Sequence, residues 1–387
     1  MKLQEVLTEE DERRFIAFPE ALYAAFPAWI RPLEEDVRAV FDPDANKTFE
    51  YGECTRWLLT EQGKVLGRIA AFVTRQKSGS VDATVAGGVG FFECVDRQDA
   101  ANALFDRATQ WLAEKGATYM DGPVNFGRRD KWWGLLTKGF EEEPNYQCNY
   151  NPPYYQQLFE GYGYKTYYEQ FTFRRRIADP VSPRLEKKAG LIAEDPSYTF
   201  RHFKASQFDR YARDIFEVYN KAWVKHEGVN PITPEQGMQL FKRLKPILDE
   251  RIIWIAYFGE TPAAIFVNIP EINQVLKHLN GSLKGLGKIK FLWYKKMRPT
   301  RKILGMIFGV VPEHQGKGLD GAIIQHFAEY AKAKLPYDIF EMNGIGDFNP
   351  KMVIVAKQVG GDVTKIHTTY RYLFDRSAPF ERMARIK

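Results

Sequence analysis

The sequence of 387 residues has few cysteines and no long apolar stretch, and both absences narrow the class of protein. The three cysteines, Cys54, Cys94 and Cys148, are odd in number and far apart, which argues against a disulfide framework or a zinc site and favours a reducing compartment. No uninterrupted apolar run reaches the length of a membrane span, and the first residues, MKLQEVLTEEDERR, contain no apolar signal region. These absences predict a soluble, cytoplasmic protein.

Metal-binding and nucleic-acid-binding patterns are also missing. The six histidines are scattered, and none is spaced from another like a pair of metal ligands, so we expect no metal. No RNA- or DNA-reading motif occurs, and the net charge of +6 does not spread over the chain. Residues 276–302 carry +9 and no acidic residue, which leaves the rest of the chain net acidic. Nucleic acid is therefore not an expected partner.

The most informative stretch is ILGMIFGVVPEHQGKGLDG, residues 303–321. The apolar run 303–311 predicts a buried strand, and a helical pattern of apolar residues follows from Leu319 to Leu335. Glycines between the two let the backbone turn sharply, and the start of a helix offers unpaired N–H groups with a partial positive charge. This order of strand, glycine loop and helix predicts a site for a phosphate or pyrophosphate.

The loop is not a Walker motif, since Leu319 follows Gly318, and its match to GxGxxG is a weak signal on its own. It resembles the GNAT family of acyl-CoA-dependent N-acyltransferases, which carries [Q/R]xxGx[G/A] between a central strand and a helix. Here this reads Gln315-x-x-Gly318-x-Asp320. Asp320 departs from the pattern: either it points away as a helix cap, or the ligand is not standard acetyl-CoA. The resemblance implies that acetyl-CoA or another acyl-CoA is held by Gly309, Val310, Val311, Gln315, Gly316, Lys317, Gly318, Leu319, Asp320, Gly321 and Asn349.

The chain contains two stretches with the same predicted order of elements. Asn349-Pro350 begins a predicted helix that ends at Gly360-Gly361, and Asn151-Pro152 begins one that ends near Gly163; a strand follows each. Both resemble the closing element of a GNAT domain. We therefore predict an α/β fold with two GNAT-like domains in tandem, each a mixed, mostly antiparallel sheet flanked by helices, although chance similarity of two α/β halves is the alternative. The expected division is residues 1–176, a linker at 177–197, and residues 198–387 with a basic insertion at 270–302.

The two predicted domains differ at the loop. In the first, the strand 85–95 leads through Asp96-Arg97-Gln98-Asp99 into a helix without a glycine loop, and Asp96 reads as a helix cap. The sequence therefore predicts that the N-terminal domain is degenerate and that acyl-CoA binds the C-terminal domain.

Candidate catalytic residues are few. In the GNAT fold the strand 339–343 borders the thioester, so Glu341 is a candidate base, acting directly or through a water, or a carboxylate paired with a Lys. Strand alternation puts Asn343 on the same face. Glu227 is a weaker candidate. The usual acid of the family is a Tyr at the position of Ala356, which cannot donate a proton; Tyr370 could replace it, or could be core.

The basic segment 276–302 interleaves apolar residues with its cations. Three interpretations are open: an element that meets an anionic membrane surface, a dock for an acyl carrier protein or a CoA phosphate, or a solvated flap. The expected function is acyl-CoA-dependent N-acyl transfer, with acetyl as the expected group, to an unidentified amine. The alternative is a non-catalytic acyl-CoA-binding, lipid-surface or acyl-carrier-associated protein.

Overall fold

The computed structural model describes residues 1–75, 85–223, 233–244 and 247–386. The elements of the N-terminal part are β1 (Lys2–Glu5), α1 (Glu9–Leu22), α2 (Glu34–Val40), β2 (Gly52–Glu61), β3 (Lys64–Arg75), β4 (Val85–Cys94), α3 (Gln98–Glu114), β5 (Tyr119–Gly122), β6 (Leu135–Lys138), α4 (Tyr155–Tyr162), β7 (Lys165–Arg176) and α5 (Pro183–Ala193). Those of the C-terminal part are β8 (Tyr198–His202), α6 (Phe208–Trp223), α7 (Pro234–Leu244), β9 (Ile253–Phe258), β10 (Thr261–Pro270), α8 (Asn273–Leu276), α9 (Leu286–Met297), β11 (Lys302–Val310), α10 (Leu319–Lys334), β12 (Ile339–Gly346), α11 (Pro350–Gln358) and β13 (Asp362–Leu373).

The order of elements repeats. Apart from β6 in the first half and the inserted helices α8 and α9 in the second, each half runs through a strand, two helices, three strands, a helix, a strand, a helix and a last strand. Thus β4, α3, β5 and α4 correspond to β11, α10, β12 and α11. This confirms the tandem arrangement predicted from the sequence. Helix α5 lies inside residues 177–197, where the sequence predicted a linker.

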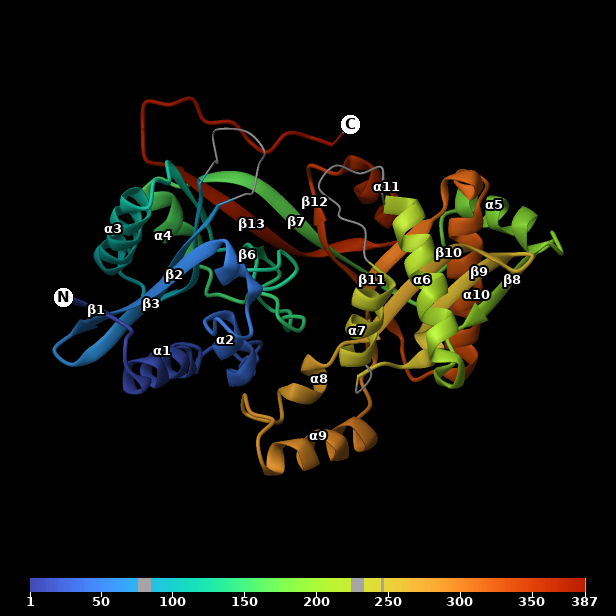
Figure 1. The fold of residues 1–387 in the computed structure, drawn as a ribbon, viewed down its shortest axis with the longest axis horizontal. Helices are drawn as coiled ribbons and strands as arrows, with labels where there is room; N and C mark the ends of the chain where they lie inside the picture. Colours follow the sequence, from blue (N-terminus) through green and yellow to red (C-terminus); the bar gives the residue numbers. More distant parts are fainter. Residues whose placement is uncertain (76–84, 224–232, 245–246, 387) are drawn as a thin grey trace.

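The two halves share one continuous sheet because their last strands are exchanged. Among the described residues the sheet has 13 strands, in the order β1-β2-β3-β4-β5-β13-β7-β12-β11-β10-β9-β8, with β6 paired to β13. Strand β7 lies beside β12 (Figure 1), and β13 pairs with β5, so each half is completed by the other's last strand. Where one domain ends and the next begins stays a prediction.

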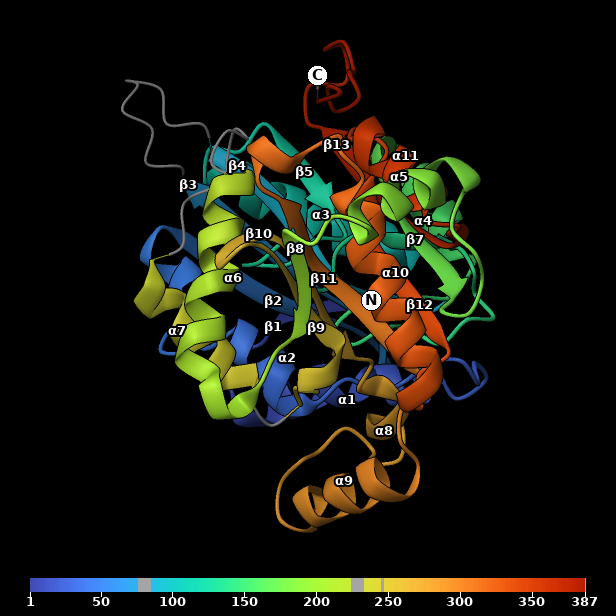
Figure 2. The same cartoon turned by 90° about the vertical axis from the view of Figure 1, so that its right-hand side faces the viewer.

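Helices cover both faces of the C-terminal part of the sheet. In Figure 2, α6 and α7 lie on one side of β8–β11, and α10, α11 and α5 lie on the other. Apolar side chains from both layers form one core with the strands, including Ile265, Ile303 and Phe327. A separate core, built around Phe105 and Phe159, fills the N-terminal part between the sheet and helices α3 and α4.

The basic insertion folds into α8 and α9 and projects from the body of the molecule (Figure 1, Figure 2). Phe291 and Tyr294 of α9 pack toward Leu33, Leu276 and Leu279. The remaining large apolar side chains of α9 are exposed: Leu286, Ile289, Leu292, Trp293 and Met297. At 3.6 residues per turn, Leu286, Ile289, Trp293 and Met297 form a stripe on the side away from Phe291 and Tyr294.

Candidate acyl-transfer site

Strands β11 and β12 separate halfway along their length. They are parallel and paired from Lys302↔Ile339 to Gly305↔Met342, yet β11 continues to Val310 and β12 to Gly346. A β-bulge lies at the point of separation, because Val267 of β10 pairs with Ile307 while Asn268 pairs with Gly305, which leaves Met306 unpaired. The result is a wedge between two strands that no longer pair with each other, a place where an extended ligand can pair with a strand edge.

The glycine loop closes the wide end of this wedge. Gly316 and Gly318 both have positive φ, 74° and 100°, which non-glycine residues rarely adopt. Gly318 is the N-cap of α10, and no side chain caps the helix. The first N–H groups of α10 therefore lack intrahelical acceptors and face the loop with the positive end of the helix dipole. Such an arrangement favours a phosphate or pyrophosphate.

Helix α5 explains part of the glycine pattern. A Cβ atom at Gly318 would lie 2.6 Å from the backbone oxygen of Lys188, and one at Gly321 would lie 2.8 Å from Leu185 Cγ. At Gly316 a Cβ would meet nothing within 4 Å. Gly318 and Gly321 are therefore needed for packing against α5, whereas Gly316 borders open space.

The other predicted cofactor residues fall around the same loop. The Gln315 side chain donates from Nε2 to the Val310 carbonyl at 2.9 Å, which ties the loop to the end of β11. Asp320 is the second residue of α10 and does not cap it, since Gly318 holds that place. Of the others, Gly309, Val311 and Leu319 are buried and Lys317 is exposed, and Asn349 caps α11 by accepting from the Met352 N–H at 3.2 Å. Their role in holding a cofactor stays a prediction.

The corresponding loop of the first half has no such opening. Arg97, the N-cap of α3, is ion-paired to Asp99 at 2.6 Å and to Glu61 at 2.8 Å. The prediction that Asp96 caps this helix was wrong, since the helix begins one residue later and no side chain caps it. Acidic side chains at this helix start disfavour an anion.

Glu341 is the centre of a buried charge cluster. Its carboxylate accepts hydrogen bonds from Arg174 Nε and from Asn145 Nδ2, both at 2.6 Å. The Nζ atoms of Lys302 and Lys365 lie at 3.3 and 3.4 Å from it. Glu341 is fully buried, and Lys365 is nearly so.

This environment determines the charge state of Glu341. Burial works against ionisation, but the cations Lys365, Lys302 and Arg174 outweigh it and lower the pKa of Glu341 to about 2. A carboxylate with so low a pKa accepts a proton poorly at neutral pH. The geometry therefore favours a structural role over the base role that the sequence suggested.

Of the other predicted catalytic residues, Asn343 lies near Glu341 and Tyr370 does not. Asn343 is on the face of Glu341, because Asn145 Nδ2 also donates to its Oδ1, at 2.8 Å. Tyr370 lies on β13 in the core of the first half, opposite Gly122, and its hydroxyl donates to Glu160 at 3.0 Å. Ala356 is fully buried. Glu227 lies outside the described residues.

Glu271 is an unusual carboxyl group that the sequence reasoning missed. It follows β10, is 1% exposed, and accepts from the backbone N–H groups of Tyr146 at 3.1 Å and Asn273 at 2.7 Å. Burial raises the pKa of Glu271 to about 7. The sequence did contain a signal for this residue. Glu271 directly follows a strongly apolar strand, and no other acidic residue occurs in the segment after it, up to residue 302.

Glu271 predicts a pH dependence of stability. Its pKa is higher in the folded chain than in the unfolded chain, so folding favours the protonated form. The stabilisation that Glu271 gives the folded chain is complete below about pH 4.5 and is lost as the pH rises through about 7. The free energy of unfolding should fall by an amount on the order of 3 kcal/mol over this range. Glu271→Gln keeps the acceptor oxygen and should remove this dependence, so its stability relative to the native chain should rise between pH 5 and 8 in urea unfolding. Parallel pH curves for native and variant chains would contradict this, and Glu260→Gln, an exposed carboxylate, is the control.

No metal centre accompanies these groups in the part of the chain that the structure describes, where no cluster of three or more His, Cys, Asp or Glu side chains could hold an ion. The described cysteines are all free thiols. Across the same residues, no helix is long and apolar enough to cross a membrane.

Two curated proteins resemble the chain over nearly its whole length. It is 27% identical over 369 residues to the bacterial ceramide synthase of Caulobacter vibrioides, covering 94% of this chain and 95% of that protein. It is also 27% identical over 375 residues to protein YghO of Escherichia coli K12, covering 94% and 93%. No family model matches the chain.

Solved structures with the same architecture are more distant in sequence. A tandem GNAT protein from the clavulanic acid biosynthesis pathway matches with a TM-score of 0.55 and 12% identity, over 97% of this chain and all of that one. The GCN5-related glucosamine N-acetyltransferase region of a fungal β-N-acetylglucosaminidase matches with a TM-score of 0.54 and 12% identity, over 96% of this chain and 38% of that longer chain. With the repeated element order, these matches show that the chain has a tandem GNAT-like fold.

Proposed function

We propose that this protein transfers the acyl group of an acyl-CoA to the amine of a long-chain amino alcohol. The observation that carries the proposal is the wedge between β11 and β12, which opens onto the uncapped start of α10. The wedge suits an extended pantetheine chain and the helix start suits its pyrophosphate. The amine class is taken from the likeness to the bacterial ceramide synthase.

The transfer is a direct exchange of bonds at the thioester. The amine nitrogen attacks the carbonyl carbon, the C–S bond breaks, the amine proton leaves to a base or water, and CoA departs as a thiol. The backbone N–H at the bulge, where Met306 has no partner residue on β10, is suited to stabilise the carbonyl oxygen as it gains charge. Met306, at the bulge, is an exposed apolar side chain next to the wedge and suits contact with an acyl chain.

Helix α9 supports a lipid substrate. Its exposed stripe of Leu286, Ile289, Trp293 and Met297 is flanked by Lys290 and Lys296, and Lys288, farther round the helix, is also exposed. A helix with one apolar side bordered by lysines suits the interface of an anionic bilayer. We therefore prefer the membrane interpretation of the insertion to a carrier-protein dock or a solvated flap.

Binding without transfer is a second candidate function. It is favoured by the buried Ala356 at the position where the resemblance expects a tyrosine acid, and by the distance of Tyr370, in the first-half core, from the wedge. This candidate shares the acyl-CoA site and differs only in the absence of turnover.

The cofactor site can be tested with a pair of variants at Gly316. Asn and Asp have the same shape, and both tolerate positive φ better than other residues, so Gly316→Asn controls for backbone strain. Gly316→Asp adds a negative charge facing the pyrophosphate, and we expect at least tenfold weaker acetyl-CoA binding in calorimetry than for Gly316→Asn. Asp99→Asn in the first half should leave the affinity unchanged. Equal affinities for the two Gly316 variants would place the pyrophosphate elsewhere.

A further inference from the structure

The first half contains a cavity in the place that corresponds to the wedge of the second half. Strands β4 and β5 pair at Gly88↔Asp121, and one further hydrogen bond follows, from the Val124 N–H to the Val89 carbonyl at 2.8 Å. Beyond that point, β4 and the segment after β5 border a cavity of about 70 Å³, lined among others by Phe91 and Pro123. This space has room for a few water molecules or a small polar head group.

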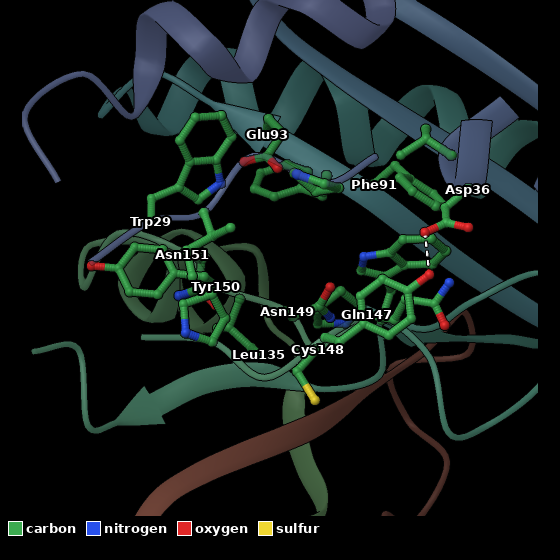
Figure 3. A pocket seen from close by; sticks show the side chains of 18 of the residues that line it. Trp29, Asp36, Phe91, Glu93, Leu135, Gln147, Cys148, Asn149, Tyr150 and Asn151 are labelled. Carbon is green, nitrogen blue, oxygen red and sulfur yellow. Dashed lines mark hydrogen bonds between the residues drawn. The ribbon is translucent and has the colours of Figure 1, made fainter. Parts of the chain in front are cut away.

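Aromatic rings and carboxylates line this cavity (Figure 3). Trp29, Phe91 and Trp132 contribute ring surfaces, and Asp36 and Glu93 contribute acids. Ring faces and carboxylates are the groups with which proteins hold organic cations. The lining therefore fits a positively charged head group better than an anion.

The two acids differ in their partners. Glu93 accepts hydrogen bonds from the hydroxyls of Tyr23 and Tyr155, at 2.5 and 2.8 Å, and lies 3.4 Å from Arg68. Asp36 accepts from the Tyr146 hydroxyl at 2.6 Å, and within the described residues no cationic side chain lies within 4 Å of it. Asp36 is thus a half-buried carboxylate that borders a cavity and makes no ion pair among the described residues. Burial raises the pKa of Asp36, and the Tyr146 hydroxyl and the charge of Lys131 oppose that rise.

Arg68 contributes a hydrogen-bond donor to the same cavity. It is 6% exposed and lines the cavity, and its Nε is among the described buried polar atoms without a hydrogen-bond partner. A buried donor left unpaired is costly, so a ligand with a hydroxyl acceptor would relieve it. A cation beside Asp36 and a hydroxyl beside Arg68 together describe an amino alcohol.

The cavity also adjoins the second-half wedge. Its lining includes Cys148, whose Sγ lies 3.9 Å from Nδ2 of Asn343 on β12. Asn273 of α8 and Tyr146, which packs with the α8–α9 cluster, complete the wall on the side of the insertion. A ligand here would lie between the element that we assign to the membrane and the strands that we assign to the thioester.

We propose that this cavity binds the cationic head group of the amine acceptor, with the Asp36 carboxylate on its ammonium. The inference rests on the proposed function, because it takes from that function the class of ligand. The first half then uses the cavity beyond the paired part of β4 and β5 as an acceptor site, while Arg97 and Asp99 occupy the start of α3.

The test is calorimetric titration with a soluble eight-carbon 2-amino-1,3-diol, with no acyl-CoA present. We expect the native chain to bind it and Asp36→Asn to bind at least tenfold more weakly. Asp44→Asn, an exposed acid nearby in the sequence, should bind like the native chain. Tyr146→Phe removes the hydrogen bond to Asp36 but keeps the carboxylate, so it should bind within a few-fold of the native chain.

Three outcomes overturn the inference. Native affinity in Asp36→Asn would show that the carboxylate does not hold the amine, and an equal loss in Tyr146→Phe would show that the Asp36–Tyr146 bond is only structural. No binding by the native chain would remove the site altogether. Failure of the proposed function is distinguishable, since a chain that binds both amine and acyl-CoA without releasing CoA keeps the site and loses the transfer.

Discussion

Replacing Glu341 with glutamine is expected to destabilise the protein by about 3–5 kcal/mol, the usual range for removing one partner of a buried ion cluster. The change keeps the size of the side chain but leaves Lys302 and Lys365, at 7% and 2% side-chain exposure, without their counter-charge. The free energy of unfolding in urea at pH 7 measures the effect.

The surface carboxylate Glu260 is a matched control. It is 75% exposed and ion-paired to Arg201 and Arg210, so Glu260→Gln should cost far less. Combining Glu341→Met with Lys365→Met should recover part of the loss, because apolar side chains replace a charge pair. If Glu341→Gln unfolds at the native urea concentration but loses turnover 100-fold or more, Glu341 is a base after all.

Removing the apolar stripe of α9 is expected to have the second large effect, a loss of binding to anionic membranes. Ile289→Ser, Trp293→Ser and Met297→Ser together should lower binding to anionic phosphatidylglycerol vesicles by at least 100-fold. Burying one such side chain contributes roughly 1.5–3 kcal/mol when complete, and three partly buried ones suffice for that loss. All three are more than half exposed, so the fold should not depend on them.

Two further sets of variants distinguish the electrostatic part of vesicle binding from the apolar part. Changing Lys288, Lys290 and Lys296 to Gln should weaken binding to anionic vesicles only, by about 1 kcal/mol for each Lys near the surface. Leu191→Ser removes an exposed leucine on α5 and should change nothing. If native protein does not bind vesicles but does co-sediment with an acidic carrier protein, the partner of α9 is that carrier protein and not a membrane.

The repeated order of elements and the position of the glycine loop could be predicted because each depends on local signals. Apolar runs set the strands at 303–311 and 85–95, and glycines and helix patterns set the turns after them. The exchange of β7 and β13 could not be predicted, since both strands have the same pattern and either partner would bury it. The duplication that made the fold recognisable therefore concealed which half each last strand completes.

Only part of the candidate site could be predicted, because only part of it consists of residues that are neighbours in the sequence. The loop residues are neighbours in sequence, so their motif was visible. The ion-pair partners of Glu341 are Arg174, Lys302 and Lys365, which lie far from it in the sequence. No pattern in the sequence near Glu341 indicates that these cations surround it and lower its pKa. The cavity is assembled from residues between Trp29 and Asn273, which only the folded chain brings together.

Amine-dependent release of CoA is the measurement that tests the central claim most directly. Native protein is incubated with palmitoyl-CoA and phosphatidylglycerol vesicles, with and without sphinganine, and free thiol is followed together with the amide product. The account predicts thiol and amide in equal amounts only when the amine is present, with turnover retained in Gly316→Asn and reduced at least tenfold in Gly316→Asp at subsaturating acyl-CoA. Native protein that binds palmitoyl-CoA but releases no thiol with sphinganine or any other amine of a panel would contradict it, and would leave acyl-CoA binding without transfer.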